Sequence, residues 1–250
     1  MSSRRQFWTE GAGSFVLAIL IALTIRWTLL EAYVIPSGSM LPTLLVHDHI
    51  FVNKIVYGLR VPFTSDWMIE FSGPRRGDVI VFKYPEKPNQ FYIKRVIGLP
   101  GDQVFYENGN LFINEQLVEK QVPQGLGQEM HWIRDEHFPG DGPEAKSHYV
   151  HWEENLGNAP HNILLKKGDQ TKVAYGPYKV PTRHYFVMGD NRDNSQDSRF
   201  WSLGKQFVPR EYLVGRAMFV WLSCDATFSL VSFLCHPATL RWNRFFYNVH

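Results

Sequence analysis

The chain has 250 residues and a formal net charge of +2, from 26 Lys and Arg against 24 Asp and Glu. This balance excludes the strongly basic surface that binds nucleic acid, so we expect no nucleic-acid partner. Hydrophobic residues make up 44% and charged residues 20% of the chain, which excludes a disordered or collagen-like protein.

The first predicted element is a membrane anchor at residues 11–30. Its first part, residues 11–25, reads GAGSFVLAILIALTI and carries no charge. At ~1.5 Å per residue this part covers roughly 22 Å of the ~30 Å hydrocarbon core. The apolar character continues past Arg26, whose guanidinium can reach the membrane interface, as far as Leu30. The pattern therefore favours one transmembrane helix, with a cleaved signal peptide or a buried core helix as the alternatives.

The charges around this anchor predict its orientation. Arg4 and Arg5 precede it, and positive residues usually stay on the cytoplasmic side. We therefore expect residues 1–10 in the cytoplasm and residues 31–250 outside it.

The exported part reads as short strands separated by turns. β-branched and aromatic residues dominate the predicted strands, and Gly, Pro, Asn and Asp bound them. Asn108-Gly109 predicts a tight hairpin because this pair readily adopts positive φ. The pattern weakens at about residues 115–182, where we predict an inserted smaller subdomain. We expect a mainly β fold of antiparallel sheets. The predicted strands are residues 48–56, 78–84, 91–98, 103–106, 111–114, 184–188 and 213–221.

Two segments could supply a nucleophile and its base. Ser39 follows a glycine in a turn-rich loop, where backbone N–H groups could converge on a developing oxyanion. A serine is a weak nucleophile and needs a base, but no histidine lies in a recognisable Ser-His-Asp context. Lys94 lies in a predicted strand, where burial would lower its pKa and make it a base. Taken singly, a turn serine and a solvated strand lysine are the commoner explanations.

A dense polar run, GDNRDNSQDSR, occupies residues 189–199. Its acids and arginines can hold a loop rigid through charge-assisted hydrogen bonds. Calcium is disfavoured, because the EF-hand pattern is absent and arginines are interspersed.

Other candidate sites are weaker. Ser202 and Lys205 match S-x-x-K, but the partner motifs of β-lactamases are missing. His47 and His49 would share a strand face, yet no third metal ligand is obvious. We expect no metal and no cofactor.

Four segments together resemble the bacterial type I signal peptidases, which are serine–lysine endopeptidases. SGSMLPTL at residues 37–44 resembles the nucleophile box, and RGDVIVF at 76–82 the next one. KRVIGLPGD at 94–102 resembles the general-base box, and residues 189–199 the last one. The order of these boxes and the preceding anchor also agree with the family. Familiar enteric members have two spans before the catalytic domain, whereas this sequence has one.

The resemblance implies roles for particular residues. Ser39 would be the nucleophile and Lys94 the general base, with the Ser37 hydroxyl and the Ser39 backbone N–H binding the oxyanion. Ser195 would hydrogen-bond and orient Lys94. Asp197 and Arg199 would form a supporting ion pair.

The resemblance also implies a substrate and a location. The family cuts signal peptides from exported preproteins after small-x-small motifs such as Ala-x-Ala. Ile35, Val81 and Ile93 could wall the shallow pockets that admit only small side chains. The enzyme would sit in the bacterial inner (plasma) membrane, with preproteins and the lipid bilayer as partners. A self-cleaving SOS-type repressor and a non-catalytic exported β domain are the alternatives.

The tail beyond Leu222 matches no motif. Cys224 and Cys235 could form a disulfide after export, or be two buried free thiols. Apolar residues of the tail could rest on the bilayer surface. These residues are Phe228, Leu230, Phe233, Trp242 and Phe245.

Overall fold

The computed structural model describes residues 13–19, 29–61, 64, 66–123, 128–138, 142–157, 159–168, 173–228 and 231–249. Residues 13–19 are helical, whereas most of the predicted anchor lies outside the described residues. No helix in the described part of the chain has the length and apolar character needed to cross a bilayer. Leu30, which the sequence analysis placed in the anchor, instead begins a strand, because it pairs with Asn53 of the next strand.

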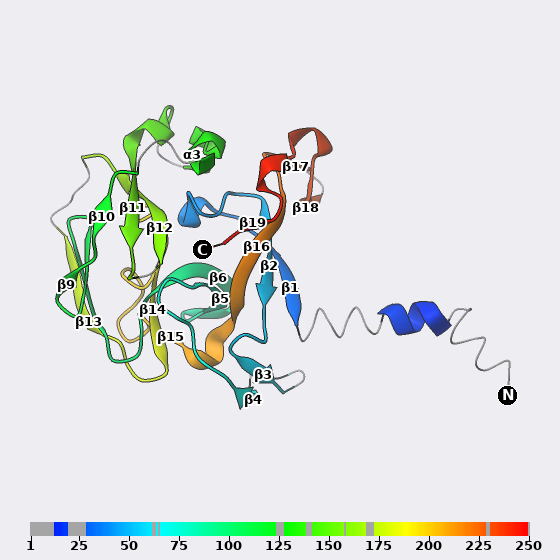
Figure 1. The fold of residues 1–250 in the computed structure, drawn as a ribbon, viewed down its shortest axis with the longest axis horizontal. Helices are drawn as coiled ribbons and strands as arrows, with labels where there is room; N and C mark the ends of the chain where they lie inside the picture. The colour runs from blue at the N-terminus through cyan, green and yellow to red at the C-terminus, as the bar shows by residue number, and fades with distance from the viewer. Residues whose placement is uncertain are drawn as a thin grey trace.

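An eight-stranded antiparallel sheet forms the centre of the protein (Figure 1). Its order is β1-β2-β16-β5-β6-β14-β15, and β19 pairs with β16. The expectation of a mainly β, antiparallel fold is therefore confirmed. Strand β6 extends further than the sequence predicted, because its first residues form a hairpin with β5. The strands of this sheet are β1 Leu30–Val34, β2 Asp48–Asn53, β5 Val79–Tyr84, β6 Lys87–Gly98, β14 His184–Met188, β15 Val208–Pro209, β16 Leu213–Ser223 and β19 Tyr247–Asn248.

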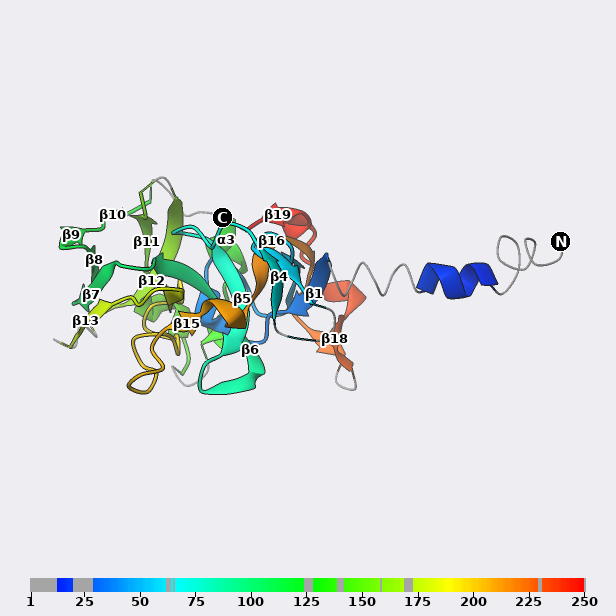
Figure 2. The same cartoon turned by 90° about the horizontal axis from the view of Figure 1, so that it is seen from below.

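Smaller sheets lie beside the main one, ordered β10-β11-β12 and β13-β7-β8-β9. In the second view, β7, β8, β9 and β13 lie at one end of the domain and β1 and β18 at the other (Figure 2). The hairpin β7–β8 turns at Asn108 and Gly109, whose φ angles of 50° and 74° confirm the expected turn. The bounds are β7 Gln103–Glu107, β8 Asn110–Ile113, β9 Gln116–Leu117, β10 Lys120–Gln121, β11 Tyr149–Asn155, β12 Pro160–Lys166 and β13 Ala174–Lys179.

Much of the predicted insertion is built from these strands, but it is not isolated from the rest. Strand β13 pairs with β7, which precedes the insertion. Glu154 of β11 forms a buried ion pair with Arg192, which follows β14, at 2.7 and 2.5 Å. The predicted insertion is thus joined to the rest of the domain by the pairing of β13 with β7 and by the buried ion pair between Glu154 and Arg192.

Short elements complete the fold. Two hairpins, β3–β4 and β17–β18, form separate two-stranded sheets. One short helix, α3, lies near the top of Figure 1, and the other helical elements are 3₁₀ turns that connect strands. Their bounds are β3 Gly58–Arg60, β4 Trp67–Glu70, β17 Thr227–Phe228, β18 Val231–Cys235, α3 Gln128–Trp132, and the 3₁₀ turns η1 Gly38–Met40, η2 Asp135–His137, η3 Ala145–His148, η4 Arg210–Tyr212, η5 Pro237–Thr239 and η6 Trp242–Arg244.

The segment after Ser39 is held between two hydrophobic cores. Met40 and Leu44 belong to a cluster on the main sheet. Leu41 and Leu45 belong to a second cluster, formed with residues of the predicted insertion. All four side chains have an exposed fraction of 0%. Since close-packed interiors leave little freedom to move, this packing fixes the backbone on the C-terminal side of Ser39.

Candidate active site

Ser39 and Lys94 meet although 55 residues separate them in the chain. Ser39 lies in η1, which follows β1, and Lys94 lies in β6. The Lys94 Nζ and Ser39 Oγ atoms are 2.6 Å apart, within hydrogen-bond distance. Nζ also donates to the Ile93 carbonyl at 2.9 Å. The Lys94 amine thus points directly at a serine hydroxyl.

The surroundings of Lys94 favour its neutral form. The residue is only 4% exposed. Burial lowers its pKa from 10.5 to about 8, while Asp197 and Asp190 oppose the shift. A lysine with this pKa is partly unprotonated near neutral pH, so it can accept a proton.

Ser37 and Gly38 shape the other side of the serine. The Ser37 Oγ donates to the Ser39 Oγ at 3.4 Å, and Ser37 is exposed. Gly38 is buried, and a Cβ at this position would lie 2.5 Å from the His137 carbonyl oxygen. We call residues 35–47, which join β1 to β2, the serine loop. A larger residue at position 38 would therefore push this loop away from η2.

The polar run after β14 supplies the expected ion pair. Asp197 and Arg199 contact each other through two hydrogen bonds of 2.9 Å, and both are buried. The Asp197 carboxylate also accepts from the Gly189 backbone N–H at 3.0 Å. The pair therefore fixes the loop to the end of β14.

Ser195 lies near the serine loop but does not bond Lys94. Its Oγ is buried and has no hydrogen-bond partner among the described residues. A Cβ added at Gly189 would lie 2.2 Å from this Oγ and 2.4 Å from the Ser39 carbonyl oxygen. The Ser195 hydroxyl is thus beside the Ser39 backbone, and the bond to Lys94 that the resemblance implied is not formed in this structure.

Sequence reasoning missed a buried network that joins the boxes. Arg95 binds Asp190 through two hydrogen bonds of 2.8 and 2.7 Å, and the Thr43 hydroxyl donates to the same carboxylate at 2.5 Å. Asn191 donates from its side chain to the Gly38 carbonyl at 3.0 Å and from its backbone to the Ser39 carbonyl at 3.2 Å. The sequence showed the polar run and an arginine within an apolar strand, but nothing local indicated that Arg95, Thr43 and Asp190 would meet.

The three predicted pocket residues lie close together. Strand pairing places Val81 opposite Ile93, and Ile35 belongs to the same hydrophobic cluster. Ile35 and Val81 are each 2% exposed, whereas Ile93 is half-buried. All three belong to one apolar cluster, and Ile93 precedes Lys94 in β6.

The weaker candidates have structural explanations. The Ser202 backbone N–H binds Glu86, and the Lys205 N–H closes a turn onto the Ser202 carbonyl. His47 adopts a φ of 65° before β2 begins, so the expected strand alternation with His49 is wrong. Within the described ranges, no three His, Cys, Asp or Glu side chains form a group that could hold a metal.

Comparisons with known proteins identify the family. A model described as "Signal peptidase, peptidase S26" matches residues 8–222. The chain therefore belongs to the peptidase S26 family of signal peptidases, and it is a hydrolase that cuts peptide bonds.

Several curated relatives carry the name signal peptidase I. The protein of Pseudomonas fluorescens is 43% identical, and that of Pseudomonas aeruginosa 41% identical, each over 86% of this chain and 72% of the relative. The protein of Aquifex aeolicus is 38% identical over 83% of this chain and 81% of the relative. Such membership implies association with a membrane, and it disfavours the repressor and the non-catalytic β domain.

Proposed function

We propose that the protein cleaves signal peptides from exported preproteins with a Ser39–Lys94 dyad. The distance of 2.6 Å between Nζ and Oγ carries this proposal. Neutral Lys94 takes the hydroxyl proton of Ser39 while Oγ attacks the scissile carbonyl carbon. The protonated lysine then gives a proton to the leaving amine, and an ester on Ser39 remains. Water hydrolyses this ester, with Lys94 again accepting a proton.

The oxyanion of each tetrahedral intermediate needs hydrogen-bond donors. The exposed Ser37 hydroxyl and the Ser39 backbone N–H lie beside the attacking oxygen and would supply them.

Removal of the Ser37 hydroxyl therefore has a large expected effect. Ser37→Ala should lower kcat by about 10²–10³-fold, because one oxyanion donor is lost. The melting temperature should stay within a few degrees of wild type, since Ser37 is exposed. Steady-state kinetics and a thermal melt check both parts. An unchanged kcat would remove Ser37 from the mechanism.

Small side chains on the substrate fit the apolar floor of Ile35, Val81 and Ile93. Strand β6 pairs with β14 only between residues 95 and 98. On that side, residues 91–94 can therefore pair with an extended peptide, as in recognition by strand addition. Backbone pairing would hold the peptide, and Ile35, Val81 and Ile93 would exclude large substrate side chains by steric clash.

Cleavage should depend on pH through Lys94. The pKa of about 8 predicts that kcat rises with pH, is half-maximal near pH 8 and levels about one pH unit higher, because only the neutral amine accepts a proton. The measurement uses full-length enzyme in detergent and a preprotein with Ala-x-Ala before the cut. A preprotein with phenylalanine at the last position and the Ser39→Ala enzyme are the controls. Cutting by Ser39→Ala, or equal cutting of both preproteins, would contradict the proposed function.

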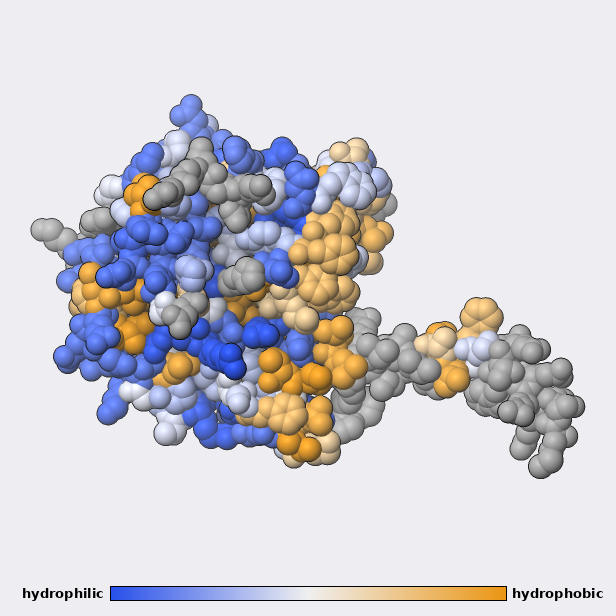
Figure 3. Space-filling view, viewed as in Figure 1, coloured by the Kyte–Doolittle hydropathy of each residue, from blue (hydrophilic) through white to orange (hydrophobic). Residues whose placement is uncertain are grey.

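The location proposed is the bacterial plasma membrane, crossed once by the apolar segment that precedes β1, with residues 1–10 in the cytoplasm. Apolar side chains gather on the side of the domain that carries β1 and β17–β18 (Figure 3). Phe228 of β17, Phe233 of β18 and Trp242 of η6 are 43%, 61% and 68% exposed. This side would rest on the lipid surface and keep Ser39 close to signal peptides that emerge from the bilayer. Phe245 is half-buried, and Leu230 lies outside the described residues.

A further inference from the structure

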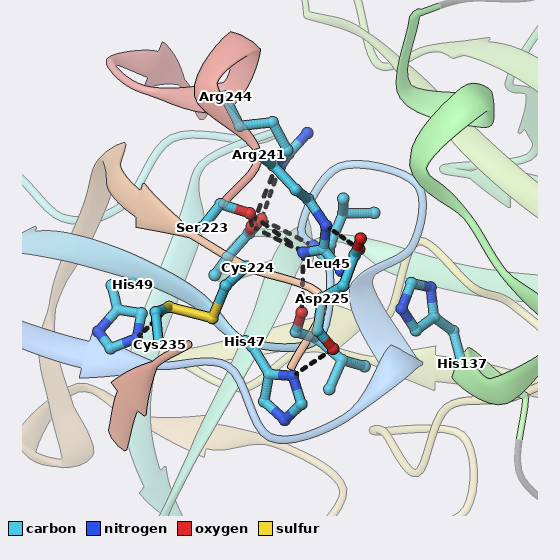
Figure 4. Close-up of polar contacts among 12 residues, drawn as sticks. Leu45, His47, His49, His137, Ser223, Cys224, Asp225, Cys235, Arg241 and Arg244 are labelled. Carbon is cyan, nitrogen blue, oxygen red and sulfur yellow. Dashed lines mark hydrogen bonds and ion pairs between the residues drawn. A yellow bond between two sulfur atoms is a disulfide. The ribbon is translucent and has the colours of Figure 1, made fainter. Parts of the chain in front are cut away.

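The part of the chain beyond the family match packs against the segment that follows Ser39. We define residues 223–249 as the C-terminal segment; the family match ends at residue 222. The segment leaves β16, forms the β17–β18 hairpin, and returns through η6 to β19, which pairs with β16. A disulfide between Cys224 and Cys235 closes its first part (Figure 4). Of the two possibilities for these cysteines, the structure therefore has the disulfide. The disulfide ties Cys235, the last residue of β18, to Cys224, which follows β16.

Arg244 is the main contact of this segment with the serine loop. Its side chain is 0% exposed. It binds the buried Asp48 carboxylate at 2.6 and 3.3 Å and donates to the Thr43 carbonyl at 3.0 Å. The same carboxylate accepts from the Leu45 backbone N–H at 2.8 Å. One guanidinium therefore holds both ends of residues 43–48.

Arg241 adds a second set of contacts (Figure 4). It donates to the Val46 carbonyl at 3.1 Å, to Ser223 Oγ at 3.1 Å and to Asp225 at 2.7 Å. Asp225 also pairs with Arg134, which precedes η2. The carbonyl of His137, at the end of η2, is the atom that a Cβ on Gly38 would meet. The C-terminal segment thus braces the serine loop directly and through η2.

The contacts continue from Thr43 to the dyad. Arg244 holds the Thr43 carbonyl, while Asp190 holds the Thr43 hydroxyl. Asn191, the next residue, binds the carbonyls of Gly38 and Ser39. Without Arg244, buried Asp48 would lose its close guanidinium partner, which is strongly unfavourable. Residues 43–48 would then shift to find other partners for that charge.

We propose that the C-terminal segment positions Ser39 for Lys94, with Arg244 as a positioning residue and the Cys224–Cys235 disulfide as the bond that keeps the segment in place. This inference rests on the dyad proposed above. A displacement of about 1 Å at a reacting atom can lower the rate by about 10²-fold. The arginine therefore acts on kcat without touching the substrate.

The test compares Arg244→Lys, Arg244→Met and the matched control Asn243→Ala, all in the full-length enzyme. Asn243 is exposed in the same turn. A lysine keeps the charge beside Asp48, but its compact ammonium cannot span both Asp48 and the Thr43 carbonyl as the planar guanidinium does. Arg244→Lys should therefore remain folded at the assay temperature and yet lose about 10- to 100-fold in kcat, with KM changed less than about 3-fold. Asn243→Ala should match wild type.

Two further outcomes decide between explanations. The double variant Cys224→Ser with Cys235→Ser, and wild type treated with a thiol reductant, should lose kcat in the same direction. Unchanged kcat in both would overturn the role of the disulfide.

A wild-type kcat in Arg244→Lys, or a loss matching the unfolded fraction seen by circular dichroism, would overturn the positioning role. If Ser39→Ala still cleaves, the dyad itself is wrong; if it is inactive while Arg244→Lys is fully active, only the positioning role is wrong.

Discussion

Replacing Lys94 with methionine should abolish cleavage while leaving the fold intact. Methionine fills a similar volume but cannot accept a proton, so the 2.6 Å contact with Ser39 loses its base. We expect kcat to fall by at least about 10³-fold, because a general base alone contributes about 10²–10⁴ and the serine depends on it. Single-turnover cleavage of a preprotein measures the loss.

The same substitution should make the protein more stable. In the folded protein the pKa of Lys94 is lowered from 10.5 to about 8, mainly by burial. Between these values the unfolded chain binds more protons, so wild-type stability rises with pH across this window and is lower below it. The shift corresponds to roughly 3 kcal/mol at neutral pH. Lys94→Met should recover part of this free energy, which denaturant unfolding would show.

Lys94→Arg is the matched control for charge. An arginine stays protonated at every pH of the assay, so it too should be inactive. Unlike methionine it should also destabilise the protein, since a permanent charge is buried. Cleavage at near the wild-type rate by either variant would rule out Lys94 as the base.

The Asp190→Ala substitution should be the most destabilising change near the site. It leaves the Arg95 guanidinium, which is 0% exposed, without its carboxylate. Burial alone would raise the pKa of Asp190, but Arg95, together with His161 and the Thr43 hydroxyl, lowers the net value. Breaking such a buried pair costs about 3–5 kcal/mol, or a melting temperature lower by about 10 °C for a chain of this size. Calorimetry measures this shift.

An exposed ion pair provides the comparison. Arg183 and Glu70 bind each other at 2.8 and 3.0 Å, but Arg183 is 56% exposed. Arg183→Ala should therefore change the melting temperature far less than Asp190→Ala does, because exposed ion pairs contribute little to stability. The double variant Asp190→Ala with Arg95→Met should recover much of the Asp190→Ala loss, because no buried charge is left alone. An Asp190→Ala loss as small as that of Arg183→Ala would contradict the role given to the buried pair.

Local patterns in the sequence predicted several strands of the main sheet, and the four boxes together suggested the proposed Ser39–Lys94 dyad. Alternating and β-branched residues predicted β5 and β14 almost to the residue, because both strands lie in the core. Ser39 and Lys94 became credible only through the boxes around them. Neither a turn serine nor a strand lysine is distinctive alone. The 2.6 Å contact agrees with that joint interpretation.

What the sequence did not predict depends on contacts between distant residues. Arg95 and Asp190 are 95 positions apart, and Arg244 and Asp48 are 196 apart. No local period marks such pairs, because each residue alone looks like a surface charge. The disulfide was undecided for the same reason: spacing permits it, but only the return of β18 to the end of β16 brings the two thiols together.

The buried pair between Glu154 and Arg192 limits how the enzyme can admit its substrate. A hinge that moved β11 away from the loop after β14 would leave both buried charges unpaired, which costs about 3–5 kcal/mol. Jaw-like opening is thereby disfavoured. An extended stretch of preprotein is therefore expected to bind to a scaffold whose two parts stay together during turnover.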